Sequence, residues 1–248
     1  MSAVPDDLAA ALAALAGRRP LLVASDYDGV LAPLADEPSA AVPSPGVDGL
    51  LARIAAADGV TVALVSGRGV EDLRQVSGFT GSYRWVGSHG AEYGGPLAGE
   101  LAGRRDALAD RLAPLVAAVP GARLEVKPAS VAVHVRQVAD PAAATRLLAD
   151  AGTAVADPSL TMKPGKAVLE VAVTDADKGS AVGRLRDELG AAAVVYLGDD
   201  VTDEDVFGTL RPGDVGIKVG DGETAAAHRV ADPAAVVDVL RQLADRLG

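Results

Sequence analysis

Short, continuous apolar runs alternate along the chain with stretches of helical periodicity. The runs contain few polar positions and are typical of buried strands, at residues 21–25, 60–65, 84–86, 192–197 and 215–219. The stretches between them are typical of helices, at residues 45–57, 70–76 and 180–189. Because continuous apolar strands that alternate with helices form parallel sheets with both faces covered, the sequence predicts an α/β fold.

The middle of the chain breaks this pattern. Helical stretches at residues 104–119 and 141–150 flank two short strands at residues 123–127 and 131–136, whose close spacing predicts a hairpin. A further strand is expected at residues 167–173. Strands of alternating character favour an antiparallel sheet with helices on one face. We therefore expect a Rossmann-like, doubly wound parallel-sheet core from residues 1–101 and 174–248, with an inserted α+β domain at residues 102–173. The glycine-rich segment 94–103 and residues 174–177 are the expected hinges.

The first residues of the chain have the pattern of a helix. Asp6 or Asp7 serves as its cap, Leu8, Leu12 and Leu15 share one face, and Gly17 ends it. We expect no signal peptide and no membrane span, since the chain has no basic segment followed by an apolar core and no charge-free run of about 18 apolar residues. The expected location is the cytoplasm, and the expected state is a monomer.

Composition narrows the kind of ligand. The net charge of −11 argues against nucleic acid or an anionic membrane as partner, because both require a positive surface. The chain has no cysteine and only 3 histidines, so any metal would be a hard cation held by carboxylates. Lysine is rare among the 23 basic residues and occurs only at positions 127, 163, 166, 178 and 218. Lysine at 127 and 178 therefore indicates a need for a compact ammonium group.

Polar groups follow the strands or open the helices of the core. These groups are Asp26 and Asp28, Ser66, Lys178, and the aspartates 199, 200 and 203. Each has a structural alternative: turn aspartates, a helix cap, a surface lysine and an acidic first turn of a helix. If the sheet is parallel, however, its strand ends share one edge and these groups converge.

In their order, these motifs resemble the haloacid dehalogenase-like phosphohydrolase superfamily. The matching residues are Asp-x-Asp-Gly-x-Leu at 26–31, Ser66, Lys178 and Gly-Asp-Asp-x-x-Asp at 198–203. The inserted domain resembles the superfamily's C2-type cap in place and size. The resemblance implies that Asp26 is the nucleophile, that Asp28 is the general acid and base, and that Ser66 and Lys178 hold the phosphoryl oxygens.

The same resemblance implies a Mg²⁺ cofactor. Its ligands would be Asp26, the backbone carbonyl of Asp28, and Asp199, with Asp200 and Asp203 as direct or supporting groups. The chemistry is consistent with this assignment. A phosphate monoester repels an anionic nucleophile, and a divalent cation both neutralises charge and aligns the reactants.

More specific sequence motifs resemble those of the trehalose-6-phosphate phosphatase family. They include the segments 65–68, 87–92 and 198–205, and in the cap Glu125-x-Lys127, His134-x-Arg136 and Glu170. The resemblance implies that Glu125, Lys127 and Glu170 bind sugar hydroxyls, and it adds Arg68 and His89 to the substrate-binding residues. Without the resemblance, the charged cap residues would be interpreted as the solvent-exposed face of a strand, because charged residues are usually exposed.

The expected activity is therefore Mg²⁺-dependent hydrolysis of trehalose 6-phosphate, a small sugar phosphate, through an aspartyl-phosphate. The cap would exclude water and set specificity. One alternative keeps the chemistry but changes the substrate to another disaccharide, pseudo-disaccharide or sugar phosphate. A second alternative is a regulatory homologue without catalysis, against which the intact Asp26, Asp28, Lys178 and Asp199 argue.

Overall fold

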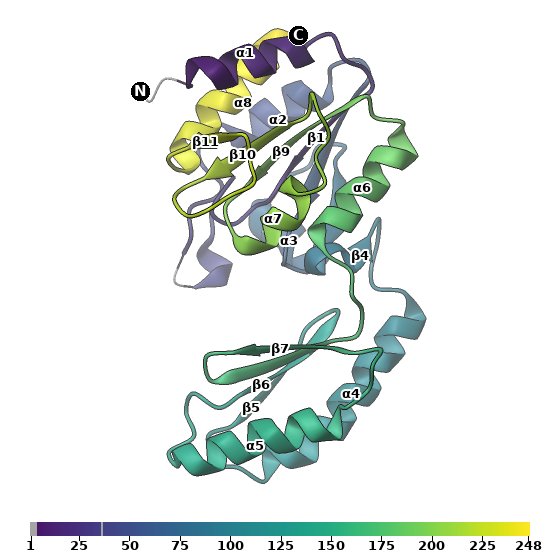
Figure 1. The fold of residues 1–248 in the computed structure, drawn as a ribbon, viewed down its shortest axis with the longest axis vertical. Coiled ribbons are helices and arrows are strands. Elements are labelled where there is room, and N and C mark those ends of the chain that lie inside the picture. The colour runs from purple at the N-terminus through teal and green to yellow at the C-terminus, as the bar shows by residue number, and fades with distance from the viewer. Residues whose placement is uncertain (1–3, 36) are drawn as a thin grey trace. The chain divides into compact units, whose positions relative to one another are not determined.

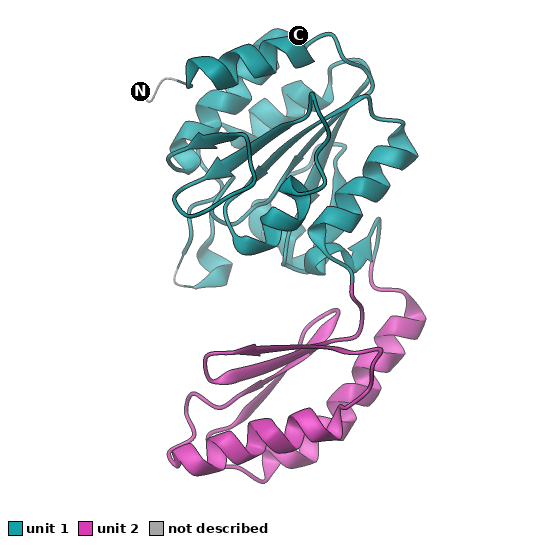
Figure 2. Cartoon of the chain, viewed as in Figure 1, with its two compact units in different colours: residues 1–95, 176–248 teal, residues 96–175 magenta. Residues whose placement is uncertain are grey.

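The computed structural model describes residues 4–35 and 37–248, which form two compact units. Among the described residues, the first unit comprises those up to residue 95 and residues 176–248, and the second comprises residues 96–175 (Figure 2). The inserted segment therefore starts a few residues before the expected boundary at 102. Part of the expected hinge at 94–103 is helical, because helix α4 begins at Gly99.

The first unit is built on a seven-stranded sheet in the order β11-β10-β9-β1-β2-β3-β4. Its strands are β1 (Leu21–Ser25), β2 (Val60–Val65), β3 (Arg84–Gly87), β4 (Glu92–Tyr93), β9 (Ala193–Gly198), β10 (Val215–Val219) and β11 (His228–Val230). All neighbouring pairs are parallel except β3 with the short edge strand β4. The central strand β1 places Leu21 beside Val60 on one side and Ala193 on the other. The carboxyl ends of β1, β2 and β9 consequently share one edge.

Helices cover both faces of this sheet, as Figure 1 shows. The helices of this unit are α1 (Asp6–Leu15), α2 (Val47–Ala55), α3 (Val70–Ser77), α6 (Lys178–Leu189), α7 (Val201–Phe207) and α8 (Pro233–Leu247), with short 3-10 turns η1 (Pro38–Ala40) and η2 (Ser88–Gly90). Successive side chains of β1 point to opposite faces of the sheet and belong to two hydrophobic cores. Leu21 and Val23 pack with residues of α1, α2 and α8, whereas Leu22 and Ala24 pack with residues of α6 and α7. The predicted doubly wound core is confirmed.

The second unit is a four-stranded antiparallel sheet in the order β5-β6-β8-β7, with two helices. Its elements are α4 (Gly99–Ala117), β5 (Arg123–Val126), β6 (Ser130–His134), α5 (Pro141–Ala154), β7 (Thr161–Gly165) and β8 (Val168–Ala172). Val131, Val133 and Val171 pack with Leu108, Leu112 and Leu147 of the helices. Because strand side chains alternate, the residues between them lie on the opposite sheet face, and these include Glu170.

The elements that were not predicted include strands β4, β7 and β11 and helix α8. Strands β4 and β11 contain two and three residues, which is too short for a periodic pattern, and β7 is an edge strand that ends in Pro164 and Gly165. Helix α8 is different, because Val236, Val239, Leu240 and Leu243 are spaced as on one helix face and are buried together. Its signal was present in the sequence.

Candidate active site

Asp26 and Lys178 form the centre of a buried ionic cluster at the carboxyl edge of the sheet. Asp26 follows β1 directly, and its backbone N–H donates to the Leu197 carbonyl at 2.9 Å, which ties it to β9. Lys178 is the first residue of α6, and its Nζ donates to Asp26 Oδ2 at 2.6 Å and to Asp203 Oδ1 at 2.8 Å. The Lys178 side chain is only 2% exposed. A lysine buried this deeply requires paired charges, and the two carboxylates supply them.

Asp203 is a fully occupied carboxylate within this cluster. Besides Lys178, its Oδ1 accepts from the hydroxyl of Tyr196 at 2.7 Å. Its Oδ2 accepts from the backbone N–H groups of Asp199 and Asp200 at 2.9 and 3.0 Å. A carboxylate has about four acceptor positions, so these contacts use all of them. Asp203 thus fixes Lys178 and the loop after β9, which favours a supporting role over direct metal binding.

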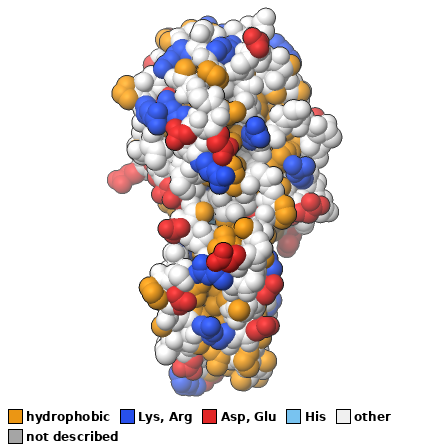
Figure 3. All heavy atoms as spheres, turned by 90° about the vertical axis from the view of Figure 1, so that its right-hand side faces the viewer, with side chains coloured by type: hydrophobic (Ala, Val, Ile, Leu, Met, Phe, Trp, Pro, Cys, Tyr) orange, Lys and Arg blue, Asp and Glu red, His pale blue; other side chains and the backbone are white. Residues whose placement is uncertain are grey.

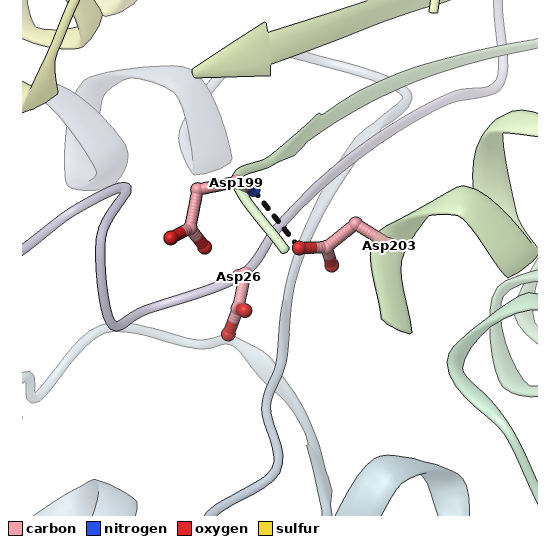
Figure 4. Close-up of side chains that lie close together, drawn as sticks. All are labelled: Asp26, Asp199 and Asp203. Carbon is pink, nitrogen blue, oxygen red and sulfur yellow. Dashed lines mark hydrogen bonds between the residues drawn. The ribbon is translucent and has the colours of Figure 1, made fainter. Parts of the chain in front are cut away.

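Asp199 lies opposite Asp26, as Figure 4 shows. One carboxylate oxygen from each of Asp26, Asp199 and Asp203 lies within 4.8 Å of the others. Gly29 makes room for Asp199, because a Cβ on Gly29 would lie 2.0 Å from Asp199 Oδ2. The backbone carbonyl of Asp199 accepts from the ammonium group of Lys218 on β10. An all-oxygen set of this kind suits a hard divalent cation.

Asp200 takes a different position from its neighbour. It is the N-cap of α7, its side chain accepts from the backbone of Val201, and it is exposed to solvent. Two aspartates adjacent in sequence therefore serve different purposes: Asp199 points into the cluster and Asp200 begins a helix.

The electrostatics of the cluster follow from its burial. Burial raises the pKa of Asp26 to about 7, with repulsion from Asp203 adding to the effect and Lys178 opposing it. Burial and the charge of Asp203 likewise raise the pKa of Asp199 to about 6. Burial alone would lower the pKa of Lys178, but Asp26 and Asp203 outweigh it and raise that pKa. The site thus holds more negative charge than one ammonium group balances, and a divalent cation would offset the excess.

Asp28 is held by Arg68. The guanidinium contacts both carboxylate oxygens, with Nε to Oδ2 at 2.6 Å and Nη2 to Oδ1 at 2.8 Å. Arg68 follows β2 in the loop that also carries Ser66, and its own backbone N–H donates to Ser66 Oγ at 3.1 Å. The predicted substrate-binding residue Arg68 is therefore engaged with the predicted general acid.

Ser66 and His89 belong to two loops that brace one another. Ser66 is buried, its backbone N–H donates to Val86, and its carbonyl accepts from the N–H of His89 at 3.0 Å. His89 has a positive φ of 56°, and its ring lies over Gly67, where a Cβ would come within 2.5 Å of the imidazole. Glu92 steadies the same loop by accepting from Ser88 Oγ at 2.7 Å and from the N–H of Val70 at 3.1 Å.

The three predicted sugar-binding residues lie together in the second unit. Lys127 Nζ donates to Glu170 Oε2 at 2.8 Å, and Ser130 Oγ donates to Glu170 Oε1 at 2.6 Å. Glu125 Oε2 lies 2.7 Å from His134 Nε2 on the neighbouring strand. The register places Glu125 opposite Ala132 and Ala132 opposite Glu170, so both glutamates occupy one sheet face with a small residue between them.

Several residues of these networks were not singled out in the sequence. They are Tyr196, Lys218 and Ser130, together with the pairing of Arg68 to Asp28. Lys218 did carry a signal, because lysine is rare in this chain and position 218 lies in an otherwise apolar strand.

On the face drawn in Figure 3, basic and acidic side chains are interspersed and no broad basic patch covers it. Over residues 4–35 and 37–248, no helix has both the length and the apolar character that crossing a bilayer demands.

Comparison with known proteins gives a consistent family. A family model described as trehalose-phosphatase matches residues 24–236. A trehalose-phosphate phosphatase of Mycolicibacterium paratuberculosis is 35% identical over 278 aligned residues, which cover 100% of this chain and 68% of that protein. The solved trehalose-6-phosphate phosphatase of Aspergillus fumigatus (crystal form 3) is 26% identical with a TM-score of 0.75, over 98% of this chain and 99% of the solved chain.

The C-terminal domain of a Candida albicans trehalose synthase regulatory protein is 13% identical with a TM-score of 0.64, covering 90% of this chain and 94% of that one. This likeness concerns the fold alone.

The fold and the carboxylate–lysine site define the class of the protein, a phosphomonoesterase with a haloacid dehalogenase-like fold. Within that class, the chain belongs to the trehalose-phosphatase family.

Proposed function

We propose that the protein hydrolyses trehalose 6-phosphate to trehalose and phosphate through an aspartyl-phosphate on Asp26, with Mg²⁺ as its metal. The observation that carries the proposal is the buried contact of Asp26 with Lys178, at 2.6 Å, in a chain of the trehalose-phosphatase family. A carboxylate at this position, next to a fixed ammonium group and an acidic metal set, has the surroundings that a nucleophile toward phosphorus requires.

In the first step, a carboxylate oxygen of Asp26 attacks phosphorus and the bond from phosphorus to the sugar oxygen breaks. Asp28 gives its proton to that oxygen, so trehalose leaves as a neutral alcohol. Two of the three N–H donors of Lys178 bond to Asp26 and Asp203, and the third remains for a phosphoryl oxygen. The hydroxyl of Ser66 supplies a second donor to the phosphoryl group.

In the second step, water attacks the phosphorus of the aspartyl-phosphate. Asp28, now ionised, takes a proton from the water, and the bond between phosphorus and the Asp26 oxygen breaks. Phosphate leaves, and both carboxyl groups return to their starting protonation states.

Asp26 and Asp199 would hold the metal, with Asp203 fixing the loop that presents Asp199. When bound, the cation neutralises phosphate charge and aligns the group that is transferred. Mg²⁺ fits this set because it is typically held by one or two carboxylates, with waters and substrate oxygens completing its shell.

Recognition of the sugar is assigned to Glu125, Lys127 and Glu170. Carboxylates accept strongly from the hydroxyl groups of a sugar, and an ammonium group donates to them. Lys127 and Ser130 hold both oxygens of Glu170 in one orientation, so this carboxylate needs little ordering when a ligand arrives.

The test is phosphate release from a panel of sugar phosphates at equal concentration, with and without Mg²⁺. We expect the largest kcat/KM for trehalose 6-phosphate and little activity in EDTA. A larger value for glucose 6-phosphate or sucrose 6-phosphate would replace the proposed substrate with another sugar phosphate. Absence of phosphate release from every compound would favour the regulatory alternative instead.

A further inference from the structure

The guanidinium of Arg68 is committed to residues of the protein. An arginine side chain carries five N–H donors. Here Nε and Nη2 bond the two oxygens of Asp28, Nη1 bonds Asp72 Oδ2 at 2.9 Å, and Nη2 also bonds the carbonyl of Pro38 at 2.7 Å. Four of the five donors are therefore used, and a two-pronged grip on a phosphate would have to break this set.

The partners of Arg68 come from three separate elements. Asp28 follows β1, Pro38 belongs to η1, and Asp72 lies in the first turn of α3. The guanidinium carbon also lies 5.9 Å from the centre of the buried Tyr27 ring. The Arg68 side chain is 10% exposed, although that of Asp72 is 58% exposed. A planar group fixed on several sides is suited to orient a carboxylate.

We propose that Arg68 is a positioning residue, which acts on the reaction through Asp28 and does not bind the substrate phosphate. The fork fixes the torsion of the Asp28 side chain, so that its oxygens meet the leaving group and later the attacking water in one orientation. This inference rests on the proposed function, because it takes Asp28 as the residue that transfers the proton.

A double-mutant cycle separates the two roles of Arg68. The variants are Asp28→Asn, Arg68→Gln and the double variant, assayed with trehalose 6-phosphate. We expect Asp28→Asn to lower kcat by about 10² to 10⁴-fold, the usual range for acid–base catalysis. Arg68→Gln should lower kcat by roughly 10- to 100-fold, and the double variant should lie within about 3-fold of Asp28→Asn, because residues that act as a unit are not additive.

Two further readouts distinguish positioning from structural support. The inhibition constant of orthovanadate, a phosphate mimic, should change by less than about 3-fold in Arg68→Gln, since no phosphate contact is lost. In single turnovers, release of dinitrophenolate from its phosphate ester should be affected about 10-fold less than release of trehalose, because a good leaving group needs no proton. The matched control is Arg74→Gln on α3, whose guanidinium packs on Trp85 and should leave kcat within about 2-fold.

Multiplicative losses in the double variant, or a tenfold weaker inhibition by vanadate in Arg68→Gln, would overturn the proposal and return Arg68 to substrate binding. If Arg68→Gln does not fold, as judged by thermal unfolding, Arg68→Lys is measured in the same cycle. If trehalose 6-phosphate is not the substrate, the cycle can still be run with whichever phosphate ester the wild-type enzyme hydrolyses. The role of Arg68 and the identity of the substrate are therefore tested separately. A wild-type protein inactive on all esters would overturn both proposals.

Discussion

At the scale of single residues, the absence of a side chain at position 29 is as important as the carboxylates around it. Gly29 has a φ of 72°, and an added Cβ would overlap Asp199 Oδ2 at 2.0 Å. We expect Gly29→Ala to push Asp199 aside and to weaken divalent-metal affinity by about 10- to 100-fold, the usual cost of disturbing groups that orient a ligand. Binding of Mn²⁺ followed by electron paramagnetic resonance measures this without an activity assay.

Gly78 provides the matched control for that substitution. Its φ of 64° is nearly the same, and nothing lies within 4 Å of an added Cβ. Gly78→Ala therefore carries the same backbone strain with no contact to the site. Equal metal affinities of the two alanine variants would contradict the role assigned to Gly29.

The raised pKa values of Asp26 and Asp199 predict how stability depends on pH in the absence of metal. The folded protein keeps protons on these groups up to pH values of about 6 to 7, whereas an unfolded aspartate loses its proton near 3.8. Between those values the folded state binds more protons, so these two groups make stability fall as pH rises. In EDTA, Asp199→Asn should raise the melting temperature by more degrees at pH 7.5 than at pH 4.

The exposed neighbour provides the comparison for this measurement. Asp200→Asn retains a good N-cap residue, and because this side chain is exposed the substitution should change the difference between the two melting temperatures by less than Asp199→Asn does. If Asp199→Asn shows no difference between the two pH values, burial and the charge of Asp203 do not destabilise the ionised Asp199 carboxylate as its raised pKa implies.

Residue roles were predictable from the sequence only where they follow from strand ends. Asp26, Ser66, Lys178 and Asp199 each follow a strand or open a helix, and a parallel sheet brings such positions together. The contact of Arg68 with Asp28 spans 40 residues and depends on side-chain orientation, which no periodicity encodes.

At the scale of elements, the start of α6 controls the position of Lys178. Asp177 caps this helix, with its side chain accepting from the N–H of Ser180, and Lys178 is the next residue. We expect Asp177→Ala to lower the free energy of unfolding by about 1 kcal/mol, as for other N-caps, and to lower kcat several-fold because Lys178 moves. Urea unfolding and phosphate release measure the two effects.

Helix α5 offers the same cap without the lysine. Asp140 accepts from the N–H of Ala142 at the start of that helix. Asp140→Ala should cost a similar amount of stability and leave kcat unchanged. A comparable loss of kcat in both variants would show that general destabilisation, not the placement of Lys178, explains the result.

Elements were predictable where the pattern was long and its period clear. Strands β1, β2, β3, β9 and β10 and helices α2, α3 and α6 appear at or near the expected residues, because each buries a continuous run or an amphipathic face. Residues 161–165 pair with β8 in spite of Pro164, since an edge strand needs hydrogen bonds on one side only. Tertiary pairing, not local propensity, makes this segment a strand.

At the scale of the whole molecule, two units with separate cores carry separate groups of candidate residues. The first unit holds the predicted nucleophile, the predicted acid–base residue Asp28 and the candidate metal-binding carboxylates, and the second holds Glu125, Lys127 and Glu170. If chemistry and sugar recognition are divided in this way, substitutions in the two units must affect different substrates differently.

Glu125→Ala and Asp26→Asn test that division. Glu125 lies in the second unit, where its side chain pairs with His134 and Arg123. We therefore expect Glu125→Ala to lower kcat/KM for trehalose 6-phosphate by about 10- to 100-fold, the cost of one lost charged hydrogen bond. The same variant should hydrolyse a small aryl phosphate at nearly the wild-type rate, because that ester has no sugar hydroxyl to recognise.

Asp26→Asn should instead lower activity toward both esters by on the order of 10³-fold or more, since every ester needs the nucleophile. The ratio of the two kcat/KM values then separates recognition from chemistry without any assumption about absolute rates. Equal losses on both esters in Glu125→Ala would mean that this residue supports the reaction itself. Unchanged values on both would mean that Glu125 belongs to a solvated strand face, and the sugar specificity of the enzyme would have to be sought among other residues of the second unit.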